Sequence, residues 1–320
     1  MAEFVTISDV ESGTRLLRWF LRHYPGMLQR DFYKLCRGGQ IRINSSRCKG
    51  TEILLSGDMV RVPPTLQSYQ KVKKTETGDK YSLSDLEKLR KCIVHNDNDI
   101  VVFNKPAGLA VQGGTGIKKS VDKMAAALFP YDKISLVHRI DKETSGLLVV
   151  AKNQKAAQIL SNQFQNKTAH KEYLALLQGA IPQKSGKIDN YVAKGHVFED
   201  FSKIPDNVVA QHAITEYKVL GEASGLLTWV LFLPRTGRTH QLRLHSAYSL
   251  GAPIVGDDLY GSKRRGIDGV FGSVLNTQKL FLFAYRITFR HPGNNKEMTL
   301  CADLPDFMQA VVNFLEFQMP

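Results

Sequence analysis

The sequence predicts an α+β protein with a small N-terminal α/β domain and a larger second domain built on a mixed, mostly antiparallel sheet. After Cys92, short apolar segments typical of strands alternate irregularly with helical stretches, a pattern that favours α+β over a doubly wound sheet. Before Pro63, two helical patterns and two alternating segments form a separate basic block. We therefore expect domains at residues 1–65 and 92–320, joined by a polar, lysine-rich linker at residues 66–91.

The length and composition are those of an ordinary globular chain. Of the 320 residues, 43% are hydrophobic and 23% are charged, which is enough to bury a core without covalent staples. The four cysteines form no CxxC pair, so we expect free thiols in a reducing compartment. No apolar run approaches the roughly 20 residues of a membrane span, and the acidic first residues are unlike a signal peptide. These features predict a cytoplasmic protein with no membrane partner.

The charge balance points to a polyanionic partner. Lys and Arg total 43 against 30 Asp and Glu, which gives a formal net charge of +13. A surplus of this size is typical of proteins that bind nucleic acid. On charge alone, a basic enzyme without such a partner remains the alternative.

In the N-terminal block, both predicted helices carry a basic stripe. Leu16, Phe20 and Leu21 recur at helical spacing in the first helix, and Phe32 and Leu35 do so in the second. The cations that fall away from these apolar faces are Arg15, Arg18, Arg22, Arg30, Lys34 and Arg37. Two basic faces on one small module favour RNA binding over a merely solvated surface.

The second part of the chain contains the strand-like segments IVVFNKPAG, LLVVAKN, EYLALLQG, LLTWVLFL and KLFLFAYRITF. The segment NQKAAQILSNQFQ has the periodicity of an amphipathic helix. We see no internal repeat and no low-complexity tract. This part therefore predicts the large sheet and at least one covering helix.

Several common catalytic signatures are missing from the sequence. There is no P-loop, no Rossmann GxGxxG and no GxSxG nucleophile. His240 and His245 lie five residues apart, so they do not share a helix face as a zinc pair would. Asp141 and Glu143 are too close in sequence to point toward each other as a glycosidase pair. We therefore expect no metal and no cofactor.

Two stretches carry the candidate chemistry. In HRIDKETSG, Asp141 lies between Arg139 and Lys142, and a solvated turn is the simplest interpretation of that stretch alone. TGRTHQLRLH concentrates arginines and histidines behind Gly237, and we expect a helix to begin there with Thr236 or Thr239 as its N-cap. Such a basic helix start can hold an anion.

Taken together, these stretches resemble the paired motifs of the RluA superfamily of pseudouridine synthases, over nearly the whole chain. HRIDKETSG is similar to the family's HRLDxxTSG, KEYLALLQG to KxYxAxxxG, and TGRTHQLRLH to TGRTHQIRxH. LFLFAYRITFRHP matches LxLHAxxLxFxHP except that Phe283 stands where His is usual. Residues 14–62, with GGQIRIN and SGDMVRV, resemble the S4 RNA-binding domain. This S4-like module and NKPAGLAVQGGTG are most similar to the C type of the large-subunit ribosomal RNA pseudouridine synthases.

The resemblance implies roles for individual residues. Asp141 would be the ionised carboxylate that either attacks C1′ of a uridine or removes a proton from C2′. Arg238 would hold that carboxylate in its charged form, and Tyr173 would stack on the displaced uracil and assist a proton transfer. Arg139 would enter the RNA stack where the target base leaves. Because the product is an isomer of the substrate, no cofactor is implied.

The implied substrate is a set of uridines in large-subunit ribosomal RNA, either free or in assembling pre-ribosomal particles. Two alternatives stay open on the sequence. One is a synthase of the same superfamily that acts on another ribosomal site or on tRNA. The other is a non-catalytic ribosome-binding protein of the S4 type, against which the pairing of HRID with TGRTHQLR argues.

Overall fold

A computed structural model describes residues 3–8, 11–24, 27–66, 81–261, 275 and 279–320. The chain divides into two compact units, Met1–Ser82 with Phe129–Tyr131 and Leu83–Leu128 with Asp132–Pro320. We call these the N-terminal and the C-terminal unit.

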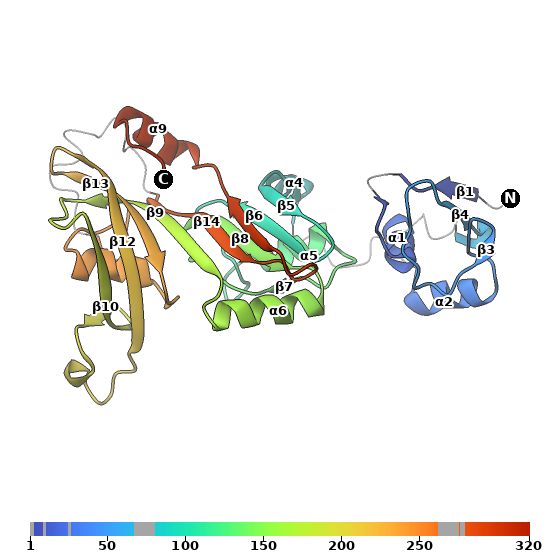
Figure 1. The fold of residues 1–320 in the computed structure, drawn as a ribbon, viewed down its shortest axis with the longest axis horizontal. Coiled ribbons are helices and arrows are strands. Elements are labelled where there is room, and N and C mark those ends of the chain that lie inside the picture. The colour runs from blue at the N-terminus through green and yellow to red at the C-terminus, as the bar shows by residue number, and fades with distance from the viewer. Residues whose placement is uncertain (1–2, 9–10, 25–26, 67–80, 262–274, 276–278) are drawn as a thin grey trace. The chain divides into compact units, whose positions relative to one another are not determined.

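The N-terminal unit packs two helices against a small antiparallel sheet (Figure 1). The helices are α1 (Leu16–His23) and α2 (Gln29–Arg37), and the strands, in the order β1-β4-β2-β3, are β1 (Glu3–Thr6), β4 (Met59–Val62), β2 (Arg42–Ile43) and β3 (Ser46–Arg47). Leu16 and Phe20 of α1 and Phe32 of α2 are fully buried with Val60 of β4. The predicted apolar stripes therefore form one core.

Part of the expected linker is helical. Residues 67–80 lie outside the described residues, but helix α4 (Leu83–Lys91) occupies the end of the stretch. Leu86 and Leu89 share one face of this helix, and Leu89 is buried in the C-terminal unit. The boundaries of the domains and the linker stay predictions.

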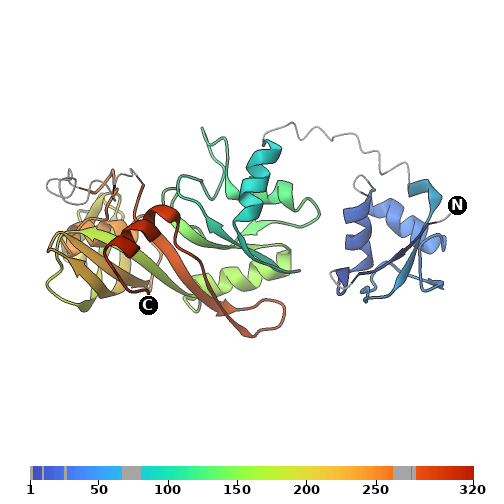
Figure 2. The same ribbon diagram turned by 90° about the horizontal axis from the view of Figure 1, so that it is seen from above.

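The C-terminal unit is built on an eleven-stranded sheet that is mixed and mostly antiparallel, as the sequence predicts (Figure 1 and Figure 2). The path runs β11-β10-β12-β13-β9-β14-β8-β6-β5, with β15 paired to β14 and β7 paired to β8. The strands are β5 (Ile93–Asn96), β6 (Ile100–Lys105), β7 (Ser135–Leu136), β8 (Ser145–Ala151), β9 (His170–Gln178), β10 (Ser185–Ala193), β11 (His196–Phe198), β12 (Gln211–Ala223), β13 (Leu227–Pro234), β14 (Leu282–Arg290) and β15 (Glu297–Cys301).

Helices accompany this sheet at several places. They are α5 (Val121–Leu128), α6 (Gln154–Gln165), the short α7 (Gln241–Leu244) with a π-helical turn η4 (His245–Ser249), and α9 (Asp306–Phe314). Helix α6 packs against β8 and β14, and it begins where the Asn153 side chain accepts a hydrogen bond from the Ala156 amide. Because helices cover central strands, every residue of β8 is buried, which explains its continuous apolar run.

The glycine of HRIDKETSG lies at a close approach of two strands. β8 and β14 form the parallel pair of the sheet, in which Ala284 lies opposite Gly146. Gly146 has a φ of 110°, and an added Cβ would lie 2.3 Å from the carbonyl oxygen of Ala284. Only glycine fits there, so this contact fixes where β8 begins after the Asp141 loop.

Among the described residues, none of the helices has both the length and the apolar character needed to cross a membrane.

Candidate active site

One cavity collects residues from both signature stretches. Its volume is about 80 Å³, and its wall comprises Arg139, Ile140, Asp141, Thr144, Lys171, Tyr173, Pro234, Thr236, Gly237, Arg238, Gln241, Leu242, Arg243 and Leu282. The loop between β7 and β8 supplies the first four, β9 supplies Lys171 and Tyr173, and the segment from the end of β13 into α7 supplies most of the others. The fold therefore brings Asp141, Tyr173, Arg238 and Arg139 to one place.

The Asp141 loop is anchored by a buried lysine. Lys105, at the end of β6, is fully buried, and its Nζ donates hydrogen bonds of 2.9 Å to the carbonyl oxygens of Pro106, Leu109 and Lys142. The carbonyl oxygen of Lys142 accepts a second bond, from the Gly108 amide. Burial lowers the pKa of Lys105 to about 7, while the charges of Glu143 and Asp141 favour the ammonium. The sequence shows this lysine in NKPAG, but it does not predict this role.

The TGRTHQLRLH loop is held by the side chain of Gln241. Its Oε1 accepts from the Thr236 hydroxyl and the Arg238 amide, and its Nε2 donates to Ile214 and Thr215. With both donors and acceptors satisfied, this amide orders the turn before α7. The expectation of a threonine N-cap is wrong. The N-cap is His240, in a left-handed conformation with a φ of 53° and with no side-chain capping bond, because the helix begins only at Gln241, five residues after Thr236.

A buried histidine ties the turn after α7 to the sheet. His245 Nε2 donates to Oδ1 of Asn190 on β10, 3.0 Å away, and Nδ1 accepts from the Thr215 hydroxyl on β12 at 2.9 Å. Burial lowers the pKa of His245 to about 4, so the ring is neutral at physiological pH. His245 is therefore a positioning residue for α7.

Arg243, on α7, points a buried guanidinium toward the cavity. It forms a two-pronged pair with Asp257, Nε to Oδ2 at 2.8 Å and Nη2 to Oδ1 at 2.6 Å. Burial on its own would lower the pKa of Arg243. The Asp257 carboxylate, and to a smaller extent the charge of Asp141, raise it by more, so the pKa of Arg243 lies above its usual value. Arg243 thus brings a second guanidinium to the cavity beside that of Arg238, and sequence reasoning placed it in the motif without assigning it a role.

Arg238 lines the same cavity. Its Nε donates to the carbonyl oxygen of His212 at 3.1 Å. His240 also approaches Asp141, with its Nε2 atom 4.0 Å from Oδ1 of Asp141. The other ring nitrogen of His240, Nδ1, is hydrogen-bonded to the Tyr260 hydroxyl. The predicted pairing of Arg238 with Asp141 stays a prediction.

Tyr173 forms the floor beside Asp141. It lies on β9 opposite Phe232 of β13 and Ala284 of β14, with 9% of its surface exposed. Burial raises the pKa of Tyr173 well above its usual range, and the charge of Asp141 raises it further. The phenol is therefore neutral, and its ring borders the cavity as a face on which a base can stack.

Comparisons with known proteins agree with this geometry. The RNA pseudouridylate synthase family matches residues 99–248. Ribosomal large subunit pseudouridine synthase C of Vibrio vulnificus is 34% identical over 315 residues, which cover 98% of this chain and 96% of that protein. The chain belongs to the RNA pseudouridylate synthase family. The corresponding protein of Haemophilus influenzae is 33% identical over 98% of this chain and 95% of its own length.

A solved structure supports the same assignment. Human RNA pseudouridylate synthase domain containing 4 aligns with a TM-score of 0.62 at 28% identity, covering 73% of this chain and 97% of that one. This chain is accordingly an RNA pseudouridine synthase, which is an isomerase.

The synthase departs from its family pattern at Phe283. This residue is fully buried in β14, between Ser145 of β8 and Leu174 of β9. Its neighbour Leu282 is the residue that lines the cavity. Phe283 therefore contributes to the core, and the missing imidazole leaves the Asp141 cavity intact.

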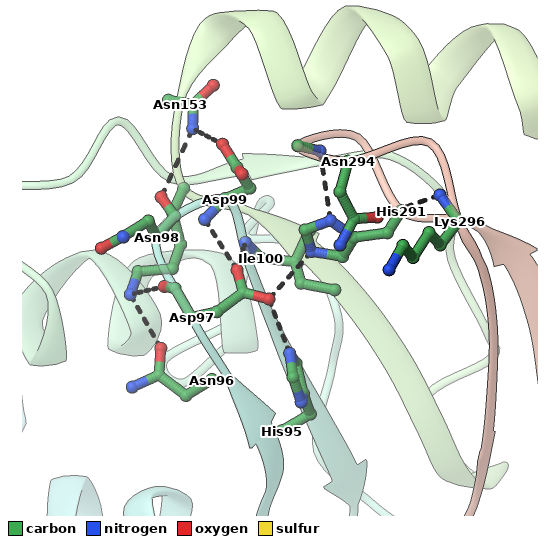
Figure 3. A network of polar contacts seen from close by, with 12 residues as sticks. His95, Asn96, Asp97, Asn98, Asp99, Ile100, Asn153, His291, Asn294 and Lys296 are labelled. Atoms are coloured by element: carbon green, nitrogen blue, oxygen red, sulfur yellow. Dashed lines mark hydrogen bonds and ion pairs between the residues drawn. The ribbon is translucent and has the colours of Figure 1, made fainter. Parts of the chain in front are cut away.

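A second polar cluster in the synthase has the residue types of a metal site. His95, Asp97 and His291 place their ligand atoms within 4.8 Å of one another, and Figure 3 shows both rings bonded to one Asp97 oxygen. The distances from Oδ2 of Asp97 are 2.7 Å to His95 Nε2 and 2.8 Å to His291 Nε2. Nδ1 of His291 accepts from the Gly293 amide, so in the neutral ring Nε2 carries the proton and has no lone pair for a metal. We interpret the cluster as a clamp between the β5–β6 and β14–β15 turns, which sequence reasoning did not find.

We expect replacement of Asp97 with Asn to destabilise the synthase by about 2 kcal/mol at neutral pH. Burial raises the pKa of Asp97, but bonds from His95 and from the Ile100 and Asp99 amides outweigh this and lower it from 3.8 to about 2. Because the pKa of Asp97 is lower in the folded than in the unfolded chain, the carboxylate stabilises the fold when the pH is above its unfolded pKa. This stabilisation is lost as the pH falls from about 4 to about 2. Chemical denaturation across this pH range measures the difference.

The exposed Asp206→Asn is the matched control and should leave stability unchanged. Equal stability of wild type and Asp97→Asn at neutral pH would contradict the clamp.

Proposed function

We propose that this synthase converts specific uridines of large-subunit ribosomal RNA to pseudouridine. The observation that carries the proposal is the cavity that combines Asp141 and Tyr173 with the arginines of α7 and its preceding loop. The substrate follows from the relatives of similar length, which are named ribosomal large subunit pseudouridine synthase C. The same bacterial relatives favour the predicted cytoplasmic location.

In this proposal Asp141 acts as the ionised carboxylate, by attack on C1′ or by proton removal from C2′. Arg238, the predicted partner, and Arg243 both line the cavity, and either guanidinium favours the negative charge of Asp141. Tyr173, as a neutral phenol, stacks on the uracil while the base is detached and turned. The bonds broken and formed lie within one nucleotide, so the proposed step requires no cofactor.

Arg139 serves base flipping. Its side chain is exposed at the cavity mouth, two residues before Asp141. Moving a base out of a stack costs a few kcal/mol, and a side chain that fills the gap offsets part of that cost. Its place beside the cavity supports the predicted insertion into the RNA.

The N-terminal unit, which we propose to be an S4-type domain, binds RNA backbone. The side chains of Arg15, Arg30, Lys34 and Arg37 are exposed and Arg18 is half-buried, whereas the side chain of Arg22 lies outside the described part of the structure. A surface cavity of about 540 Å³ is lined by Arg30 and Arg37 of α2 together with Arg47 and Lys49. Clustered cations of this kind suit phosphate contacts.

Neutralising Arg30, Lys34 and Arg37 together to Gln is expected to weaken ribosomal RNA binding and its salt dependence. Each lost phosphate contact should flatten the slope of log affinity against log salt by about 0.7–0.9, so the triple variant should lose about two to three units. The maximal chemical rate should survive, since Asp141 lies in the C-terminal unit. Titration at several salt concentrations measures the slope.

The matched control neutralises three exposed lysines of the C-terminal unit that lie outside the Asp141 cavity, Lys155, Lys187 and Lys218. An unchanged slope for the N-terminal variant would show that its stripes do not contact RNA backbone.

The proposed substrate is tested by mapping pseudouridines in ribosomal RNA and tRNA from cells with and without this protein. Loss of specific sites in large-subunit RNA, restored by the purified enzyme, is the expected result. Loss confined to tRNA would instead favour the other substrate class. Unchanged maps with retained ribosome binding would favour a non-catalytic role.

A further inference from the structure

A second cavity adjoins the Asp141 cavity and is strongly cationic. Its volume is about 450 Å³, and it shares Arg139, Lys171, Gly237 and Arg238 with the first. Lys167 and Arg235 add further positive charge. Of the described residues that line it, none is Asp or Glu, so the cavity has the charge of an anion-binding groove.

Lys171 is a half-buried cation of this groove, whereas Arg139, Lys167 and Arg235 are exposed. It lies two residues before Tyr173 on β9, so the two side chains project from the same face of the strand. Burial lowers the pKa of Lys171. Within the described residues, its ammonium has no hydrogen bond and no ion pair, unlike Arg235, which pairs with Glu216 at 2.7 Å. A charge buried without a partner is costly, which indicates that its partner comes from elsewhere.

Among the described residues, the groups around Lys171 do not supply that partner. Asp141 lines the first cavity with it, but no ion pair joins the two side chains. Glu172 projects from the other face of β9 and pairs with Arg286 at 3.0 Å. The ring of His138 accepts a hydrogen bond at Nε2 from the Val149 amide, and desolvation and the charge of Lys171 lower the pKa of His138 to about 3. This neutral ring does not balance the ammonium.

The loop opposite Lys171 leaves the ammonium accessible. Gly237 is exposed, and a Cβ added there would lie 3.4 Å from Nζ of Lys171. At that distance an added methyl group would be in van der Waals contact with the ammonium, so a side chain at position 237 would narrow the approach to it. Glycine thus leaves room for a ligand atom between the loop and the strand.

We propose that Lys171 binds a backbone phosphate next to the target uridine, and that the second cavity holds the adjoining nucleotide. This inference rests on the proposed RNA substrate. The phosphate supplies the missing counter-charge, and a lysine is suited to it as a compact point charge. Lys171 would thereby fix where the ribose lies relative to Asp141 without touching the reacting bonds.

The test compares the wild type with Lys171→Met on a ribosomal RNA fragment that the wild type modifies. We expect the variant to bind about ten- to a hundredfold more weakly, as for one charged hydrogen bond. The salt slope should flatten by about 0.7–0.9. Replacing one phosphate beside the target uridine with a neutral methylphosphonate should lower the RNA affinity of the wild type by the same factor as the Lys171→Met substitution does. The same replacement should not lower the affinity of Lys171→Met any further. Lys187→Met, on β10 and outside both cavities, is the matched control.

Stability distinguishes this role from a structural one. Without RNA the ammonium has no partner and destabilises the fold. In the absence of RNA, Lys171→Met should therefore melt at the same temperature as the wild type or at a higher one. Gly237→Ala keeps the charge but shields it, and should also weaken RNA binding.

Three results would overturn the assignment. They are unchanged affinity and slope in Lys171→Met, a clearly lower melting temperature, or a lost chemical rate at saturating RNA with affinity intact. Whether the wild type forms pseudouridine in the fragment tests the proposed function. The comparison of the wild type with Lys171→Met tests the role of Lys171, so the two proposals can fail independently.

Discussion

Purified Asp141→Asn is expected to form no measurable pseudouridine while it binds RNA within a few fold of the wild type. Asparagine keeps the shape of the side chain but removes the negative charge that attacks C1′ or takes a proton from C2′. Loss of a general base alone costs about 10²- to 10⁴-fold, and loss of a nucleophile removes the pathway. Quantifying pseudouridine after single-turnover incubation, with RNA affinity measured in parallel, checks both halves of the expectation.

Glu143→Gln is the matched control for Asp141. Its carboxylate belongs to the same loop, is about half exposed and lies 3.5 Å from Lys142. Because Glu143 does not line the cavity, its replacement should keep most of the activity. Turnover by Asp141→Asn, or an equal loss in both variants, would remove Asp141 from its proposed role.

Removing the charge of Arg243 is expected to slow the chemical step by about 10²- to 10³-fold, as for the loss of one preorganised electrostatic contact. Its guanidinium lines the cavity beside Asp141, where it favours the negative charge that the reaction uses. Single-turnover rates at saturating enzyme measure this loss.

The variant has to leave the fold intact. Arg243→Met alone would strand the buried Asp257 carboxylate, a change that costs about 3–5 kcal/mol. Arg243→Met combined with Asp257→Asn avoids the unpaired charge. Its control is Arg243→Lys, which keeps a cation beside the Asp257 carboxylate. A slower chemical step in the double variant, with most of the rate kept in the control, supports Arg243.

Arg238→Met separates the two arginines. If Arg238 rather than Arg243 pairs with Asp141, as the motif resemblance suggests, the slower chemical step should appear in Arg238→Met and be absent from the double variant. Arg238 bonds to a backbone carbonyl rather than to a carboxylate, so this variant leaves no buried charge unpaired.

The sequence by itself determined the features whose signals are local. The apolar run of β8, the Asn153 cap and periodicity of α6, and the apolar stripe of α1 all lie within about one element, where backbone geometry and side-chain spacing decide the outcome. It also predicted the mixed sheet and, through paired motifs, that Asp141 and Tyr173 belong to one site. Motifs carry this information because their residues serve the same chemistry.

Only the tertiary structure decided which partners these residues meet. Arg238 and Arg243 are five residues apart in one motif, and the left-handed turn at His240 with the Gln241 amide determines how each guanidinium is directed. The clamp joins Asp97 to His291 across 194 residues, with no spacing rule to predict it. Packing likewise gives Lys105 three carbonyl partners, whereas the part of the chain that the structure describes offers no hydrogen bond to the ammonium of Lys171. Desolvation and pairing depend on packing between distant segments, and a linear pattern does not record that packing.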